Sequence, residues 1–513
     1  MSASKTFDIE APLKGGALLL AAIVLATANF MAVLDMTIAN VSIPNITGSL
    51  GISSSQGTWV ITSYSVAQAI IVPLTGWLAA RFGAVRVFTT AMGLFGIFSA
   101  VCGLSGSLAM LVFGRIMQGL SGGVLMPLSQ MLLMRIFPKE KAPQAMALWA
   151  MTTLVAPILG PILGGYLCDN YSWPVIFFIN VPIAIVCAPI ALRMLKRYET
   201  TILRLPIDKI GLVLLIVFVG ALQLMLDLGK EHDWFESTGI CLLAVIAVIG
   251  FLAFLIWELT ERNPIVDLRV FRHSGFTTAV LTISLGFGAI FGMNVLTPLW
   301  LQSYMGYTAT WAGLATAWSG VLAVMAAPLA GILIAKTDPR RLIFAGLMWL
   351  AVVTLLRTYS TTDMTYWQIA QPLIMMGLGL PFFFVPVTAL ALSSVEEHEM
   401  ASAAGLQNFL RTLSGAVATS VVTTSWENKT SVIHAELVGD VDRTGEMART
   451  LGSSGMGADS IRSVLDNLLQ SQSVMLATNR IMMIVAVVCA LGAFLIWLAP
   501  RPTRAVDMTQ AGH

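Results

Sequence analysis

Charged residues are scarce in this sequence. Asp, Glu, Lys and Arg together make up 11% of its 513 residues, whereas 57% are hydrophobic. Apolar segments of about 20 residues, the length that crosses a bilayer as a helix, therefore occupy most of the chain. This balance confines the chain to the polytopic membrane proteins, and we expect an all-α architecture.

Histidine and cysteine are also rare, with five of each. The histidines lie outside the expected spans, which leaves none in the membrane for a protease triad or a metal site. His398 begins the string HEMAS, but Ser402 stands where a zinc-protease helix needs its second ligand. The cysteines show no paired spacing and fit packing positions in or beside apolar spans.

A nucleotide-binding loop of the GxxxxGK[ST] type is missing as well. The sequence therefore gives no basis for ATP hydrolysis, and a pump built from this chain would draw its energy from an ion gradient. We expect no enzyme activity, no metal and no cofactor.

Hydropathy predicts about fourteen transmembrane helices. We place them at 15–36, 57–79, 85–106, 108–131, 144–167, 173–195, 209–228, 238–258, 276–301, 310–334, 340–358, 366–392, 403–425 and 478–499.

Loop charges predict the orientation. Loops 37–56 and 302–309 carry no basic residue, whereas basic residues recur in the alternate loops: Lys5, Lys14, Arg81, Arg86, Arg135, Lys139, Lys141, Arg193, Lys196, Arg197, Arg204, Lys336, Arg340 and Arg341. The basic side is the cytoplasmic side by the positive-inside rule. Both termini are then cytoplasmic. The polar 426–476 loop lies outside and is part helical, because SIRSVLDNLL has apolar residues three and four apart.

One predicted span carries a bare helical face. Ala156, Gly160 and Gly164 recur every four residues, which lets a neighbouring backbone approach closely. Pro157 and Pro161 each remove a backbone donor and bend the same helix. Such a helix suits a place where two helix bundles move against each other, although a tightly packed helix pair of no special function has the same spacing.

The sequence around this face resembles the antiporter motif of proton-coupled drug exporters in the major facilitator superfamily. The match falls on Ala156, Gly160, Pro161, Gly164 and Gly165, and similar strings extend over essentially the whole chain. The resemblance implies the major facilitator fold with two inserted helices, and it implies that these residues take part in conformational switching.

A weak internal repeat agrees with two similar halves. IVPLTGWLAARFGAVR aligns with MAAPLAGILIAKTDPRR, which places Pro73 opposite Pro328 and Gly76 opposite Gly331. Parallel six-helix halves are the expected build of the superfamily. We expect an N-terminal six-helix bundle at 1–200, two inserted linker helices at 201–262, and a C-terminal six-helix bundle at 263–513.

A charged residue inside a membrane span costs free energy, so we expect each one to have a structural or functional role. Asp35 lies near the outer end of the first span, and the resemblance implies that it binds the coupling proton; a carboxylate merely at the membrane interface is the alternative. Arg115 matches the RxxQG pattern of the fourth helix together with Gln118 and Gly119, and there the resemblance implies a part in proton coupling. Arg411 is a third charge, either structural or substrate-binding.

One loop departs from the superfamily pattern GxLADRxGRR. The chain reads GWLAARFGAVR, with Ala80 where the gate-closing Asp is expected, although Gly76, Arg81 and Gly83 are kept for conformational switching. Another pairing must therefore hold the inward gate closed.

The resemblance implies a proton-coupled multidrug efflux pump of the bacterial inner membrane that exports lipophilic compounds. It implies an EmrA-like periplasmic adaptor, of the membrane fusion protein type, and a TolC-like outer-membrane channel as partners. Bulky or polar residues expected to bind substrate are Met31, Gln118, Trp149, Met293, Phe384 and Arg411. A proton-coupled symporter, an exporter of one metabolite and a transport-dead sensor remain as alternatives, although the sensor would be expected to lose Asp35 or Arg115.

Overall fold

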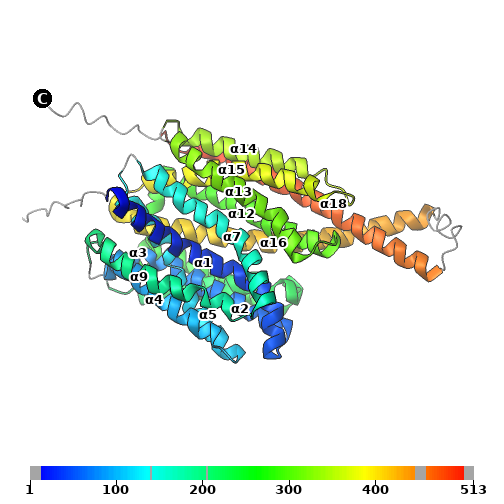
Figure 1. Ribbon diagram of the computed structural model, residues 1–513, viewed down its shortest axis with the longest axis horizontal. Helices are drawn as coiled ribbons and strands as arrows, with labels where there is room; N and C mark the ends of the chain where they lie inside the picture. The colour runs from blue at the N-terminus through cyan, green and yellow to red at the C-terminus, as the bar shows by residue number, and fades with distance from the viewer. Residues whose placement is uncertain (1–12, 139–140, 204–205, 335, 445–457, 502–513) are drawn as a thin grey trace, which may run out of the picture.

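Helices make up nearly all of the computed structural model, which describes residues 13–138, 141–203, 206–334, 336–444 and 458–501 (Figure 1). The N-terminal helices are α1 Gly15–Leu50, α2 Ser54–Ile71, α3 Thr75–Phe82, α4 Ala84–Gly103, α5 Leu108–Gly122, α6 Leu125–Ile136, α7 Ala142–Asn170, α8 Val175–Phe178 and α9 Asn180–Leu195. After them come α10 Lys209–Leu228 and α11 Thr238–Thr260, then α12 Ser274–Tyr304, α13 Ala309–Ile334, α14 Pro339–Arg357, α15 Tyr366–Ser393, α16 Met400–Thr444 and α18 Ala458–Leu495.

Proline and glycine interrupt two of the spanning helices. Pro73 lies in a 3-10 turn between α2 and α3, where its missing N–H breaks the regular ladder. Gly122 ends α5 and Gly123 follows it, before α6 begins at Leu125. Each interrupted pair still forms one unit that is apolar enough to cross a membrane, over Gln56–Phe82 and Leu108–Ile136.

Within the described residues, twelve helices are long and apolar enough to span a membrane. The bent helix α7 is a thirteenth, because its two parts, Gln144–Pro157 and Ile162–Cys168, meet at 43°. α16 is the fourteenth: Gln407, Asn408 and Arg411 lower its hydropathy, yet it packs inside the bundle against α12 and α18. The predicted all-α bundle of about fourteen helices is confirmed.

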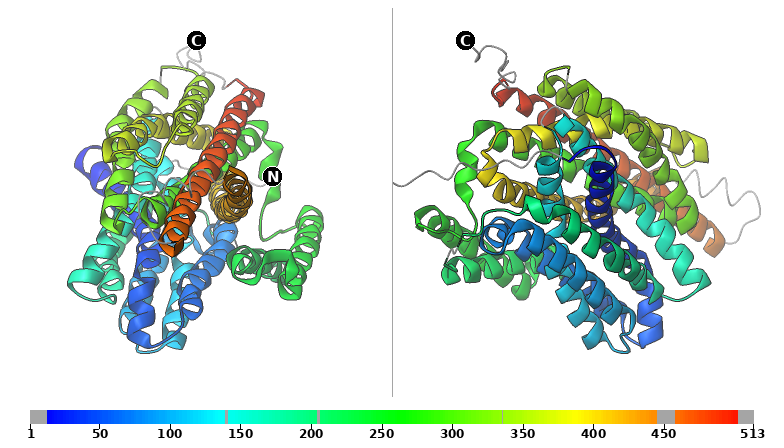
Figure 2. Two further views of the ribbon diagram at one scale, coloured as in Figure 1. Left: turned by 90° about the vertical axis from the view of Figure 1, so that its right-hand side faces the viewer. Right: turned by 60° about the vertical axis from the view of Figure 1, so that its left-hand side comes forward.

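The helices form two halves that lie side by side, with α1 to α9 in one and α12 to α18 in the other (Figures 1 and 2). α7 and α16 lie at the boundary, where α7 packs against α13 and α16 packs against α3 and α6. α1 begins and α18 ends at one end of the bundle, here called the terminal end. α16 and α18 project from the opposite end, here called the hairpin end (Figure 1).

One predicted loop is wrong and another is more helical than expected, because helices continue through them. α1 extends to Leu50, so the expected loop at 37–56 shrinks to a short turn in which Gly51 has a left-handed conformation, with φ 65°. The expectation that the polar 426–476 loop is part helical is confirmed, because α18 begins at Ala458 and includes SIRSVLDNLL. Its helical part is larger than expected, since α16 continues to Thr444. Residues 445–457 lie outside the described part of the chain.

Candidate functional site

The acid and the base singled out in the sequence meet inside the N-terminal half. Asp35 of α1 and Arg115 of α5 form an ion pair, with 2.6 Å between Asp35 Oδ2 and Arg115 Nη1, and neither side chain has any exposed surface. Removing one partner of such a pair leaves an uncompensated buried charge. A carboxylate resting at the membrane interface does not fit this enclosure.

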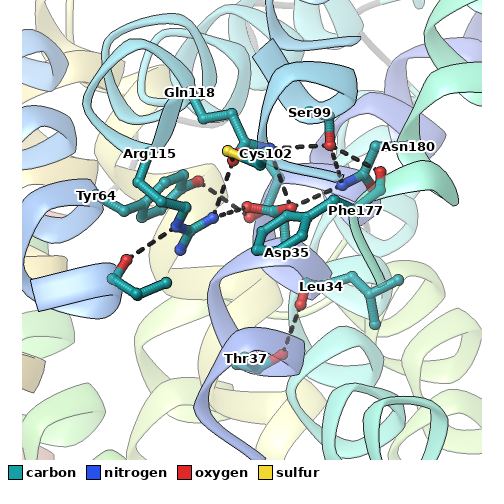
Figure 3. Close-up of polar contacts among 12 residues, drawn as sticks. Leu34, Asp35, Thr37, Tyr64, Ser99, Cys102, Arg115, Gln118, Phe177 and Asn180 are labelled. Carbon is teal, nitrogen blue, oxygen red and sulfur yellow. Dashed lines mark hydrogen bonds and ion pairs between the residues drawn. The ribbon is translucent and has the colours of Figure 1, made fainter. Parts of the chain in front are cut away.

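Three further polar side chains complete the site (Figure 3). Asp35 Oδ1 accepts hydrogen bonds from Asn180 Nδ2 at 2.7 Å and from Gln118 Nε2 at 3.3 Å. Both amides also donate to Ser99 Oγ, which in turn donates to the carbonyl oxygen of Phe177 at 2.8 Å. The carboxylate thus accepts two hydrogen bonds at Oδ1 and one at Oδ2, and a proton added to it would weaken the ion pair with Arg115.

Arg115 is held on its other side by α2. Its Nε donates to the Val60 carbonyl oxygen at 2.9 Å, and its guanidinium lies 4.2 Å from the centre of the Tyr64 ring. Arg115 Nη2 has no hydrogen-bond partner among the described residues. The arginine therefore keeps partners on α2 if Asp35 is neutralised, because a backbone oxygen and an aromatic face both stabilise a guanidinium.

Sequence reasoning missed part of this network. Asn180 and Ser99 were not singled out, although Asn180 is a polar residue in the apolar string FFINVPI. Gln118 was expected to bind substrate, but the structure places it between Arg115 and Asp35. A polar side chain that interrupts an apolar helix was the available signal in each case.

A second buried cation lies at the boundary between the halves. Arg411 of α16 is 1% exposed, and its Nε and Nη1 atoms have no hydrogen-bond partner among the described residues. Its guanidinium lies 5.1 Å from the centre of the Trp149 ring of α7 and 5.2 Å from that of Phe287 of α12. Phe287 also packs edge to face with Phe384 of α15. Arg411 thus contacts Trp149 directly, and the unforeseen Phe287 connects Arg411 to Phe384.

The remaining two expected substrate residues are buried in the same continuous apolar core. Met31 of α1 has no exposed surface and Met293 of α12 is 1% exposed. They line no open space in this closed arrangement, so any contact with a substrate requires the halves to separate.

Hydrogen bonds connect the helix that carries Asp35 to the helix that carries Trp149. Asn29 of α1 donates through Nδ2 to Thr152 Oγ1 and to Thr153 Oγ1, each at 2.8 Å. The Trp149 indole N–H is itself fixed by Ser129 Oγ at 3.2 Å. α1 and α7 are therefore held together between the Asp35 network and the Arg411 cluster.

The bare face of α7 packs against α1 of its own half, not against the other half. A Cβ on Gly160 would lie 2.9 Å from Thr37 Cβ and 3.1 Å from the Ile38 amide nitrogen. Ala156 and Gly164 are buried along the same helix, whereas a Cβ on Gly165 would meet nothing within 4 Å. The Pro161 side chain lies outside the described part. The small residues thus let α1 approach, and α7 contacts α13 of the other half separately.

At the terminal end, the two halves touch through a glycine. A Cβ on Gly76 of α3 would lie 2.8 Å from Ser402 Cα of α16, and one on Gly405 would lie 3.0 Å from the Val72 carbonyl oxygen. Asn408 adds a hydrogen bond across the halves to Gln130 Oε1 at 2.7 Å. The halves are therefore in backbone contact at this end, as a closed gate requires.

Glu199 supplies a carboxylate to the loop that lacks one at Ala80. Its Oε1 accepts from the Val85 N–H at 2.8 Å and its Oε2 from the Arg86 N–H at 3.1 Å, at the start of α4. A helix N-terminus favours a negative charge because its first N–H groups are unpaired. This carboxylate binds within the N-terminal half and does not reach across to the other.

Residues after Glu199 bind the same loop. Thr200 Oγ1 accepts from the Ala84 N–H at 2.9 Å and donates to the Ala79 carbonyl oxygen at 3.0 Å. The Leu203 N–H donates to the Ala80 carbonyl oxygen at 2.7 Å. The linker after α9 therefore fixes the shape of the gate loop.

The two switching residues that follow Ala80 also have defined places in this loop. The Arg81 guanidinium lies 5.5 Å from the centre of the Trp77 ring. Gly83 has a φ of 92°, a backbone conformation that residues with a side chain rarely adopt. The glycine is therefore needed for the turn from α3 into α4.

A cluster of ionisable residues joins the starts of α12 and α16. His273 Nε2 lies 2.8 Å from Glu399 Oε2, and Arg272 Nη2 lies 2.9 Å from Glu399 Oε1. Burial alone would raise the pKa of Glu399, but the hydrogen bond with His273 and the charge of Arg272 outweigh it and lower the pKa. With Glu396 these groups could surround a cation, but Arg272 already neutralises the carboxylate, so the cluster acts as an ionic clamp.

Comparison with known proteins identifies a family and several similar proteins. The Major Facilitator Superfamily sequence profile matches residues 25–419. The chain is 44% identical over 498 residues to the multidrug export protein EmrB of Escherichia coli strain K12, covering 96% of this chain and 97% of that protein. It is also 44% identical over 495 residues to the fatty acid resistance protein FarB of Neisseria gonorrhoeae, covering 96% and 98%.

A solved structure supports the fold. The human organic anion transporter MFSD10 superimposes with a TM-score of 0.57 at 13% sequence identity, covering 94% of this chain and 100% of that one. At this identity the likeness concerns the fold alone.

Proposed function

The chain belongs to the major facilitator superfamily, and we propose that it is a proton-coupled multidrug efflux pump that exports lipophilic compounds. The observation that carries the proposal is the enclosed Asp35–Arg115 ion pair in a membrane-spanning bundle. Ionisable residues inside a membrane bundle are costly and commonly mark ion pathways and proton relays. The EmrB and FarB relatives support export of drugs and lipophilic compounds.

In the proposed cycle, Asp35 exchanges its proton as the two halves rock. When the halves open to the outside, water reaches Asp35 and a proton from water binds one carboxylate oxygen. Protonation weakens the ion pair with Arg115, Arg115 keeps its bonds to α2, and the changed contacts favour the opposite facing state. Differential affinity of this kind is what any coupled change requires.

Substrate binding would act at the boundary cluster around Arg411. In the closed arrangement the Trp149 ring covers the guanidinium, so separation of α7 from α16 would expose two unpaired N–H groups to a substrate. The Asn29 hydrogen bonds tie α7 to the helix that carries Asp35. Proton and substrate would then favour different arrangements of the same two helices, which makes their binding mutually exclusive.

The pump would sit in a bacterial inner membrane with both termini in the cytoplasm. Basic residues at the terminal end, among them Arg81, Arg193 and Arg341, support this orientation by the positive-inside rule. The helical hairpin of α16 and α18 would then enter the periplasm. There it could meet an EmrA-like adaptor that connects to a TolC-like outer-membrane channel.

Transport by inverted membrane vesicles tests the proposal. We expect a lipophilic compound added outside energised vesicles to be taken up while protons leave, and we expect Asp35→Asn to abolish both movements. Asp363→Asn, which changes an exposed acid, serves as the control. Uptake that is unaffected by Asp35→Asn or by collapse of the proton gradient would contradict proton-coupled export.

Two narrower alternatives make different predictions in the same vesicles. A proton-coupled symporter would move protons in the same direction as its substrate. An exporter of one metabolite would respond to a single compound in a chemically varied panel.

A further inference from the structure

The first helix of the inserted pair lies at the seam between the two halves. α10 packs against α2 of the N-terminal half and against α16 of the C-terminal half, while α11 packs mainly on α10. Figure 2 shows this pair in green at the flank of the bundle. α10 therefore contacts both of the bodies that move in alternating access, whereas α11 stands outside them.

Contacts with both halves gather at the hairpin end of α10. Ser420 Oγ of α16 donates to the Leu226 carbonyl oxygen at 3.2 Å, and Lys230 Nζ lies 2.7 Å from Glu427 Oε1 of α16. On its other side α10 packs against α2 of the N-terminal half. Separation of the halves at this end must break one of the two sets of contacts.

Asp227 lacks the partners of an ionised carboxylate. Its Oδ1 accepts from Gln223 Nε2 at 3.0 Å, but its Oδ2 is buried with no hydrogen-bond partner among the described residues. Lys230, the nearest basic residue along the chain, is paired with Glu427. His232, in the turn after α10, has its Nδ1 3.1 Å from the Leu228 carbonyl oxygen.

The helices packed around Asp227 offer no cation to take the place of Lys230. α2 contains no charged residue, α16 has none between Arg411 and Glu427, and α11 has none before Glu258. Arg411 itself lies between the rings of Trp149 and Phe287. A buried carboxylate that faces no positive charge is much less costly when it carries a proton.

We propose that Asp227 is a second proton-binding site of the transporter. It takes a proton from outside water when the seam opens at the hairpin end, holds it while α2 and α16 close the seam, and releases it towards the cytoplasm after the halves have rocked to the opposite facing state. Asp35 has the opposite charge state in the same closed arrangement, because it is paired with Arg115. This inference rests on the proposed proton-coupled function, and it assigns the inserted helix a part in coupling.

The proton stoichiometry tests the proposal in proteoliposomes. With the membrane potential clamped at zero and a neutral substrate, the substrate gradient at equilibrium should rise with the square of the proton gradient in the wild type. It should rise in direct proportion in Asp227→Asn, because one of the two protons is lost. Asp363→Asn, an exposed acid at the same end of the bundle, should match the wild type.

Infrared spectroscopy gives a readout that does not depend on transport. The wild type should show the C=O stretch of a buried protonated carboxyl group, and Asp227→Asn should lack it. Asparagine has nearly the shape of a protonated aspartate, so the variant is expected to fold. An unchanged stoichiometry or an unchanged carboxyl band in Asp227→Asn overturns the proposal, whereas a wild type that shows no proton coupling overturns the proposed function instead.

Discussion

The carboxylate of Glu199 occupies the space that a side chain on Gly83 would need. A Cβ at Gly83 would lie 2.6 Å from Glu199 Cδ, and the same carboxylate accepts hydrogen bonds from two N–H groups in the first turn of α4. The absence of a side chain at Gly83 thus leaves the space that the Glu199 carboxylate occupies. The contacts between Glu199 and the residues at Gly83 and the start of α4 hold the gate loop in shape although position 80 is alanine.

We expect Gly83→Ala to destabilise the gate loop by about 1–3 kcal/mol, because its backbone conformation is strained for any side chain. Glu199→Ala should cost about 1 kcal/mol through loss of the N-terminal cap of α4. Both variants should increase labelling of a cysteine placed at Ser402 from the terminal side. Glu199→Gln, which keeps one acceptor, should lie between them and the wild type. Equal labelling in all four proteins would contradict a role in gating.

Loss of the Asp35 charge should stop coupling without unfolding the protein. Asp35→Asn removes the partner of Arg115, which still keeps its contacts with Val60 and Tyr64. We expect no drug-dependent proton movement in vesicles, together with normal amounts of protein in the membrane. Asn180→Leu should weaken coupling in the same direction, because it removes the 2.7 Å donor to the carboxylate.

The glycines of α7 should differ sharply in their tolerance of a large side chain. Gly160→Leu would drive atoms into the α1 backbone at Ile38, so export should be lost. Gly165→Leu, further along the same helix, meets open space and should export normally. Resistance of a pump-deleted strain to a lipophilic drug measures the difference, and equal activity of both variants would mean that the approach of α1 and α7 is not needed.

Arg411 should favour substrates that carry an acidic group. Its two unpaired N–H groups can bind a carboxylate or a phenolate in a charge-assisted manner. We expect Arg411→Gln to reduce transport of lipophilic acids roughly tenfold or more, while neutral compounds are much less affected. Arg411→Lys keeps the charge but not the planar fork, so it should retain part of the preference. A uniform loss across both classes would point to a structural role.

The helical hairpin should be the docking site for the adaptor. We expect cysteines along 453–471 to crosslink to it; of these positions, 453–457 lie outside the described residues and the rest belongs to α18. Removing equal numbers of helical turns from the tips of α16 and α18 should abolish resistance in cells while vesicles still exchange protons for drug. Retained resistance in cells would exclude the hairpin as the docking site.

The sequence alone was sufficient to predict features that depend on one helix or on one charged residue inside it. Span positions follow from apolar length, and Asp35, Arg115 and Arg411 stood out because a charge in an apolar helix is expensive. The partners of these residues were harder to find. Ser99 and Asn180 are ordinary polar residues until the fold brings α4 and α9 to Asp35.

Other features depend on distances that no local pattern encodes. The bare face of α7 was correctly expected to accept a close neighbour, but spacing could not show that this neighbour is α1. Glu199 lies far along the chain from the loop that it caps, so the sequence around Ala80 contains no sign of it. The long end of α1 was missed because hydropathy marks membrane depth and does not mark where a helix ends.

α16 is one uninterrupted helix of 45 residues, which corresponds to a rod of roughly 65 Å. It starts beside the gate at Ser402, passes the Arg411 cluster and the α10 seam, and ends at Thr444 in the hairpin. A rod of this length acts as a lever, because a sideways push at its tip tilts its base. A protein bound to the hairpin would therefore transmit force along α16 to the distant gate. Opening and closing of the gate would in turn move the hairpin and the protein bound to it.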